Sequence, residues 1–179
     1  MSAPSRYVIK VFLYGIEPVI WRRFSIPVGA TFAGLHTAIQ QGMGWKDEQL
    51  HEFRHGKGKR LMSVIGPDHE EVPKGDSFED EEKFTLKEFV GRRRLPLRLL
   101  YRYDFHADWV HEIAIEETSD AGKGDRPILL GGERACPPED TGGPEGYMAA
   151  LQGDLEWLDD DYDPAKFDPK KVTFGKPVR

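Results

Sequence analysis

Residues 97–117 read LRLLYRYDFHADWVHEIAIEE and contain two runs in which apolar and polar residues alternate. Alternation with a period of two is typical of β-strands that bury one face. The three residues His106–Asp108 between the runs predict a hairpin connection. The register that follows places apolar partners on one face: Phe105 with Trp109, Tyr103 with His111, Tyr101 with Ile113 and Leu99 with Ile115. The opposite face pairs opposite charges: Arg102 with Glu112 and Arg98 with Glu116.

The N-terminal region predicts a second hairpin and then a helix. Residues 7–14 (YVIKVFLY) and 19–26 (VIWRRFSI) both alternate, and the segment GIEP between them supplies a turn. With Gly15–Pro18 as a four-residue loop, Phe12 pairs with Trp21 and Val11 with Arg22, which places Arg22 on the apolar face, where we expect it at the rim of the sheet. The helix is expected to begin after Thr31 as N-cap and to end at Gly42 and Gly44. Its apolar positions recur at helical spacing: Phe32, Leu35, Ile39 and Met43.

The rest of the chain completes an α+β fold. Residues 50–55 and 61–65 predict strands, residues 66–82 predict a polar surface loop, and Thr85 with Glu88 predicts a capping box for a short helix. We therefore expect a single domain over residues 1–179. It contains a mixed or mostly antiparallel sheet, a β-hairpin–helix start that resembles a β-grasp unit, and short helices packed on the sheet. The acidic segment 153–179 is expected to pack on this domain through short helical turns after Asp163 and Asp168.

The composition excludes several protein classes. The chain has 179 residues, of which 39% are hydrophobic, and a net charge of −6, so it has no general attraction for nucleic acid. No apolar run approaches the ~20 residues that span a bilayer. A single cysteine excludes an internal disulfide framework. We expect a cytoplasmic protein without membrane association.

Residues 136–147 read CPPEDTGGPEGY and predict a stiff corner. The residue before a proline is extended, and Gly142–Gly143 allows backbone angles that other residues avoid. A helix is expected to begin at Gly146 and Tyr147. The corner thus holds Glu139 and Asp140, whose carboxylates are expected on backbone amides or an arginine. Cys136 would act as a nucleophile only with His51 or His111 close by, and this interpretation is the weaker one.

Three histidines lie at positions where a ligand or a structural role is conceivable. His36 flanks the apolar stripe of the first helix, and the favoured interpretation is a partly buried ring bonded to the backbone. His111 stands among aromatic residues, where burial favours neutral imidazole and a core role. A mixed metal site is an alternative with four candidates: His51, His111, Glu139 and Asp140. They lack the short CxxC or HxxxH spacing of zinc sites, so no cofactor is predicted and a divalent metal stays an alternative.

Several motifs together resemble the plasmid pRiA4b ORF-3-like family. They are IKVFLYGIEPVIWRRFSIP, the LH of GLHTAIQQGMGW, LHEF, YRYDF with DWVHEI, and CPPEDTGGPEGY. The resemblance covers nearly the whole chain and implies an α+β domain without an established activity. Members of the family occur on plasmids, beside insertion-sequence transposases and in ordinary chromosomes.

The family pattern carries over to these positions: Trp21, Arg22, Arg23, His36, Gly44, Trp45, His51, Phe53, Tyr103, Asp104, Phe105, Trp109, His111, Glu116, Cys136, Pro137, Pro138, Glu139, Asp140, Gly142, Gly143, Gly146 and Tyr147. The chain departs from the pattern at the hairpin turn. The family's Tyr-Asp-Phe-Gly-Asp is Tyr103-Asp104-Phe105-His106-Ala107 here, which removes a glycine and a carboxylate. Since histidine adopts a positive φ less readily than glycine, the turn is expected to differ.

The function expected from these observations is a non-catalytic interaction module that binds a protein partner and is linked to mobile genetic elements. Its binding surface is expected where the 104–111 hairpin end meets the 136–147 loop. The residues of that surface are Asp104, Trp109, His111, Cys136, Glu139, Asp140 and Tyr147. The first alternative is a metal-dependent hydrolase or nuclease that uses His51, Asp104, His111, Glu139 and Asp140. The second is a nucleic-acid-binding accessory protein that uses two basic clusters, Arg54 to Arg60 and Arg92 to Arg94, although their spacing favours solvated charge.

Overall fold

A computed structural model describes residues 5–56, 62–67, 72, 74–153 and 158–175. One eight-stranded sheet dominates, with the strand order β5-β4-β3-β6-β7-β1-β2-β8. Only the β4–β5 pair is parallel, so the expected mostly antiparallel α+β fold is confirmed. The elements are β1 (Arg6–Leu13), β2 (Trp21–Pro27), α1 (Phe32–Met43), β3 (His51–Gly56), β4 (Met62–Gly66), β5 (Ser77–Asp80), α2 (Leu86–Val90), β6 (Leu97–Tyr103), β7 (Trp109–Ser119), β8 (Ile128–Glu133), α3 (Gly143–Leu151) and the 3₁₀ turn η1 (Pro169–Lys171).

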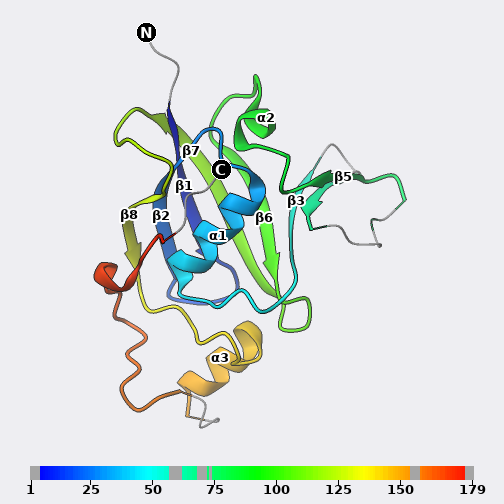
Figure 1. The fold of residues 1–179 in the computed structure, drawn as a ribbon. Helices are drawn as coiled ribbons and strands as arrows, with labels where there is room; N and C mark the ends of the chain where they lie inside the picture. The colour runs from blue at the N-terminus through cyan, green and yellow to red at the C-terminus, as the bar shows by residue number, and fades with distance from the viewer. Residues whose placement is uncertain (1–4, 57–61, 68–71, 73, 154–157, 176–179) are drawn as a thin grey trace.

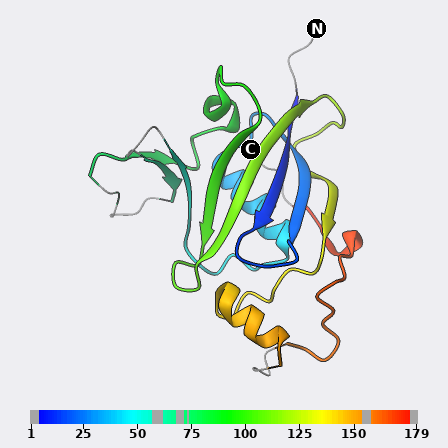
Figure 2. The same cartoon turned by 180° about the vertical axis from the view of Figure 1, so that it is seen from behind.

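The helix α1 covers one face of the sheet and lies in front of it in Figure 1. In Figure 2, the view from behind, the opposite face of the sheet lies in front of α1. The N-terminal hairpin has the expected register, with Phe12 opposite Trp21. Thr31 caps α1 by accepting a hydrogen bond from the amide of Gly34, and Gly44 ends the helix in the left-handed conformation. The core lies between α1 and the sheet, where Phe32 packs edge-on against Phe53 of β3.

Arg22 does not lie at the rim as expected. Its side chain is buried, and its guanidinium donates to the carbonyl oxygens of Gly42, Trp21 and Glu133 at 2.8–3.0 Å. The ring of Phe167 covers it at 4.3 Å. Carbonyl groups at the end of α1 and along β8 therefore satisfy this buried cation without a carboxylate.

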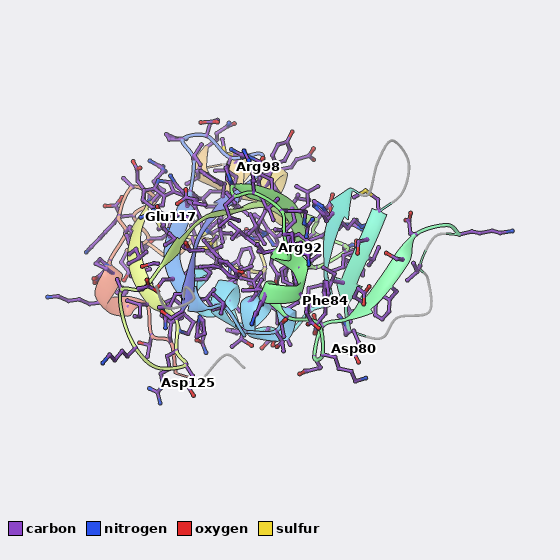
Figure 3. All side chains as sticks on the ribbon, turned by 90° about the horizontal axis from the view of Figure 1, so that it is seen from above. Asp80, Phe84, Arg92, Arg98, Glu117 and Asp125 are labelled. Carbon is purple, nitrogen blue, oxygen red and sulfur yellow. The ribbon has the colours of Figure 1, made fainter. Side chains whose placement is uncertain are left out.

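The central hairpin has a different register from the expected one. Tyr101 faces His111 and Tyr103 faces Trp109, a shift of two residues, while each side chain keeps its face of the sheet. The reason is a five-residue turn. Asp104 and Asp108 adopt positive φ values of 54° and 57°, and the Asp104 carboxylate accepts hydrogen bonds from the amides of His106 and Ala107. The ion pair on the outer face thus joins Arg98 with Glu112, and Figure 3 shows Arg98 on the side of the sheet away from α1.

Three further elements differ from expectation. The 66–82 segment is not only loop, because β5 forms within it and pairs in parallel with β4. The helix α3 begins at Gly143, three residues early, because Pro144 suits the first turn of a helix. The strand β8 was not predicted at all. The capping box of Thr85 and Glu88 at α2 is confirmed.

The described part of the C-terminal segment packs on the domain. Phe174 lies 5.8 Å from Phe24 of β2, between ring centroids. Asp168 caps η1 as expected, whereas Asp163 accepts from the amide of Ala165 in a turn. Within the described residues, no helix has both the length and the apolar character needed to cross a bilayer.

Candidate functional site

The proline-rich corner lies against the end of the central hairpin, as expected. The indole N–H of Trp45 donates to the carbonyl oxygen of Pro137 at 2.9 Å, and that of Trp109 donates to the carbonyl oxygen of Glu139 at 3.2 Å. Both indole rings are buried, with ring centroids 5.4 Å apart. The loop after α1, the hairpin end and the corner therefore form one packed junction.

Glu139 is the centre of the polar contacts in this junction. One carboxylate oxygen accepts from the hydroxyl group of Tyr103, and the other accepts from the amide of Lys46 at 2.8 Å. The Tyr103 oxygen in turn accepts from the amides of Glu48 and Gln49 at 3.0 and 3.2 Å. Burial and the neighbouring Glu139 carboxylate raise the pKa of the Tyr103 phenol, which therefore stays protonated and acts as a donor. The expectation that Glu139 binds a backbone amide is confirmed.

Gly143 brings the two segments into backbone contact. A Cβ atom at this position would lie 2.0 Å from the carbonyl oxygen of Ala107 in the hairpin turn, and φ is +80°. The turn itself accommodates His106 and Ala107 because the positive φ angles belong to Asp104 and Asp108. The departure from the family pattern thus falls on two positions that do not need glycine.

A pocket of about 420 Å³ opens beside the junction. Its lining residues come from the loop after α1, the hairpin turn and the corner: Met43, Gly44, Trp45, Lys46, Glu48, Gln49, Asp104, Cys136, Pro137, Pro138, Glu139 and Asp140. Four of these residues are acidic and one is basic. The side chains of Glu48 and Asp140 have no hydrogen bond or ion pair within the described part of the chain, so the pocket has an acidic rim.

The seven residues of the expected surface divide into two groups. Asp104, Cys136, Glu139 and Asp140 line the pocket. Trp109, His111 and Tyr147 are fully buried, so their side chains support the junction from inside and do not lie on a surface. Tyr147, for example, bonds the hydroxyl group of Tyr162 at 2.9 Å. Large aromatic rings gain most from such burial, which is why they lie behind the wall of the pocket.

The two groups that could act as nucleophile or base at this junction are not poised for it. Burial raises the pKa of the Cys136 thiol to about 12, so the reactive thiolate is scarce at neutral pH. Burial lowers the pKa of His111 to about 4, and its Nδ1 contacts the carbonyl oxygen of Trp109 at 3.2 Å. The Nε2 atom of His111 is buried without a hydrogen-bond partner among the described residues.

A second polar group, next to the junction, involves His36 and His51. His36 does not bond to the backbone, as was expected, but to side chains: Nδ1 lies 2.8 Å from the Tyr101 hydroxyl and Nε2 lies 2.7 Å from the Asp47 carboxylate. His51 bonds Glu81 through Nε2 at 2.7 Å. The sequence did not point to Asp47 or Glu81. Asp47 adopts a positive φ of 59°, a backbone conformation in which aspartate is enriched.

Of the four metal candidates from the sequence, only His51 belongs to a group with metal-ligand spacing. Among the described residues, the group of three whose ligand atoms lie within 4.8 Å of one another is His36, Asp47 and His51. His111, Glu139 and Asp140 are not part of it. The five-residue set of the hydrolase alternative is therefore divided between two places.

Arg54 and Arg93, one from each basic cluster of the nucleic-acid alternative, do not lie on the same face of the sheet. Arg54 points to the outer face of the sheet and pairs with Glu52, whereas its neighbour His55 contacts Arg93, which also covers the ring of Phe89. Residues 57–61, which hold the rest of the first cluster, lie outside the described residues.

The whole architecture recurs in known proteins. The model of the plasmid pRiA4b ORF-3-like protein family matches residues 5–171. An uncharacterised protein of Sinorhizobium fredii, y4hQ, is 34% identical over 175 residues, which cover 88% of this chain and 83% of the relative. A protein of unknown function from Methanosarcina mazei Go1, whose crystal structure is known, is 35% identical in sequence. The superposition covers 97% of this chain and 99% of that protein's chain, with a TM-score of 0.82. The chain therefore belongs to the plasmid pRiA4b ORF-3-like family.

Proposed function

We propose that the protein is a binding module whose junction pocket receives an arginine or lysine side chain of a protein partner. The observation that carries the proposal is the pair of free carboxylates, Glu48 and Asp140, on the rim of a pocket whose walls are held by buried indole and phenol hydrogen bonds. Charge complementarity of this kind selects cationic partners and speeds their association. Pockets of several hundred cubic ångströms can enclose a single anchoring side chain.

A non-catalytic role is favoured because the polar groups of the junction are already engaged in structural bonds. Glu139 uses both carboxylate oxygens, and His111 and Cys136 have pKa values far from neutrality. Catalysis by acid, base or nucleophile needs groups with pKa values near the working pH. The module is further proposed to act as an accessory protein of mobile genetic elements, which is supported by the family description, since that description refers to a plasmid reading frame.

The test is calorimetric titration with peptides of equal length that carry arginine, lysine, glutamine or glutamate at the central position. We expect binding of the cationic peptides alone, and a loss of affinity of at least about tenfold for the double variant Glu48→Gln/Asp140→Asn. The control is Glu82→Gln, which neutralises an exposed carboxylate between β5 and α2 that does not line the pocket, and should bind as the wild type does. Equal binding of the acidic peptide, or an unchanged double variant, contradicts the proposal. So does binding to duplex DNA alone, which would weaken steeply with salt.

A further inference from the structure

His36 and His51 form an unusual pair in the interior. Their rings are 4° from parallel with centroids 3.5 Å apart, a separation that leaves almost no lateral offset. Ring pairs favour offset or edge-to-face contact over this direct face-to-face arrangement. Both side chains are buried. The two rings are therefore held together by something other than their own attraction.

A carboxylate bonds each ring of the pair. Nε2–H of His36 donates to Asp47, and Nε2–H of His51 donates to Glu81, both at 2.7 Å. Glu81 is buried, and its backbone is fixed by the amide of Ala33 and the carbonyl of Gly66. Among the described residues, no lysine or arginine pairs with either carboxylate. Two acidic groups thus face two imidazoles without a lysine or arginine partner among the described residues, and one of them, Glu81, is buried, where an unbalanced charge is costly.

We propose that His36, Asp47 and His51 bind a divalent transition-metal ion, with Glu81 as the carboxylate that orients His51. The ligand atoms of the three residues lie within 4.8 Å of one another, and they come from α1, from the loop after it and from β3. The His36–Asp47 separation of 2.7 Å is a hydrogen-bond distance, and on a tetrahedral ion the two ligand atoms move to about 3.3 Å apart while the stacked rings tilt so that their nitrogen lone pairs converge on the ion. A doubly charged cation would also balance the two carboxylates.

The donor set defines the class of ion. Two imidazoles and one carboxylate suit zinc and its neighbours, whereas calcium and magnesium prefer oxygen ligands alone. Glu81 engages Nε2 of His51 and so leaves Nδ1 of that ring for the ion, which is the common carboxylate–histidine–metal arrangement. Binding at Nε2 of His36 needs the tautomer whose Nδ1–H donates to the oxygen of Tyr101, and that oxygen already accepts from Gln40 at 2.9 Å.

Access to the site is through Asp47. Its side chain is 53% exposed, and its backbone amide is anchored by the side chain of Gln40 at 3.1 Å. Three protein ligands leave positions on the ion for water, which is how open zinc sites are built. None of the four residues lines the junction pocket, and the test of the site uses metal ions without any peptide.

The test titrates the metal-stripped full-length protein with Co²⁺ alone and with Zn²⁺ alone. We expect one ion per chain, visible ligand-field absorption from a low-coordinate Co²⁺ ion, displacement by Zn²⁺ and a rise in Tm. Asp47→Asn keeps the left-handed backbone and should weaken binding at least tenfold, His51→Gln should abolish it, and Glu81→Gln should weaken it by about tenfold. The control is His106→Gln, which removes an exposed imidazole of the hairpin turn and should bind as the wild type does.

Several results would overturn the proposal. They are a wild type without the Co²⁺ absorption, an Asp47→Asn variant that binds as tightly as the wild type, and a His106→Gln variant that is weakened as much as Asp47→Asn. The last result would show that exposed imidazoles hold the ion. If circular dichroism shows that His51→Gln does not fold, Asp47→Asn decides the matter, because Asp47 lies at the surface.

Discussion

Tyr103 joins three segments of the chain through one hydroxyl group. Its oxygen accepts from two amides of the loop after α1, and its proton goes to Glu139 in the corner. The sequence placed Tyr103 on the buried face of its strand correctly. It could not indicate these partners, because they lie 36 to 55 residues away along the chain.

Removing this hydroxyl group should loosen the whole junction. Tyr103→Phe leaves two amides and one oxygen of the Glu139 carboxylate without this partner, so we expect the free energy of unfolding to fall by roughly 2–3 kcal/mol. Tyr14→Phe is the matched control, since Tyr14 is 70% exposed and should change stability little. Urea unfolding of both variants measures the difference. Equal effects in the two variants would show that the hydroxyl group does not hold the junction.

His111 should make stability depend on pH. Its pKa falls from 6.5 to about 4 on burial, so the unfolded chain binds a proton at a higher pH than the folded chain does. The free energy of unfolding therefore decreases as pH falls from about 6.5 to about 4, by roughly 3 kcal/mol from this residue. Its ring faces Tyr101 and Trp45, and within the described part of the chain no hydrogen bond or ion pair joins it to a carboxylate.

The measurement compares urea unfolding at several pH values for the wild type, His111→Phe and His106→Gln. The pH dependence of His111→Phe should be shallower than that of the wild type, and His106→Gln is the control for replacing an exposed histidine. Because His36 is also buried with a lowered pKa, His111→Phe should keep part of the dependence. Parallel curves for all three proteins would mean that His111 does not titrate in this way.

At the scale of elements, alternation predicted strands and faces but not every register. A shift of two residues leaves each side chain of β6 and β7 on its face, so the apolar pattern fits both registers equally. The turn makes the choice, through the left-handed Asp104 and Asp108. β8 carries Gly131 and Gly132, which disfavour strands, yet these glycines make room for Trp21 and Phe167.

The contact between the corner and the hairpin turn depends on one glycine. Gly143→Ala adds left-handed strain and a clash with the Ala107 carbonyl, so we expect a loss of several kcal/mol and a displaced corner. Gly142→Ala is the matched control, because its φ of +78° is similar but no atom lies within 4 Å of the added Cβ. It should cost only about 1–2 kcal/mol. Thermal unfolding of both variants measures the difference, and equal losses would mean that the close approach does not matter.

At the scale of the whole molecule, the sequence predicted the α+β class, the N-terminal hairpin with its helix, and the meeting of the hairpin end with the corner. Local patterns are sufficient for the class and for the hairpin with its helix, because capping residues and alternation act over a few positions, whereas the meeting of the hairpin end with the corner joins segments about 30 residues apart that no local pattern specifies. The group of His36, Asp47, His51 and Glu81 could not be found in this way. It is assembled from α1, a loop, β3 and the end of β5, whose order in the sheet no local pattern specifies.

The central claim is that the junction is a ligand-binding surface, and the two buried indoles report on it directly. Nitrogen-resolved NMR spectra of the wild type should be recorded while an arginine-containing peptide is added. We predict that the indole N–H signals of Trp45 and Trp109 shift in a saturable way. The signal of Trp21, which bonds Glu133 at the edge of the sheet, should stay in place. Saturable binding that leaves the Trp45 and Trp109 signals unmoved would contradict the account.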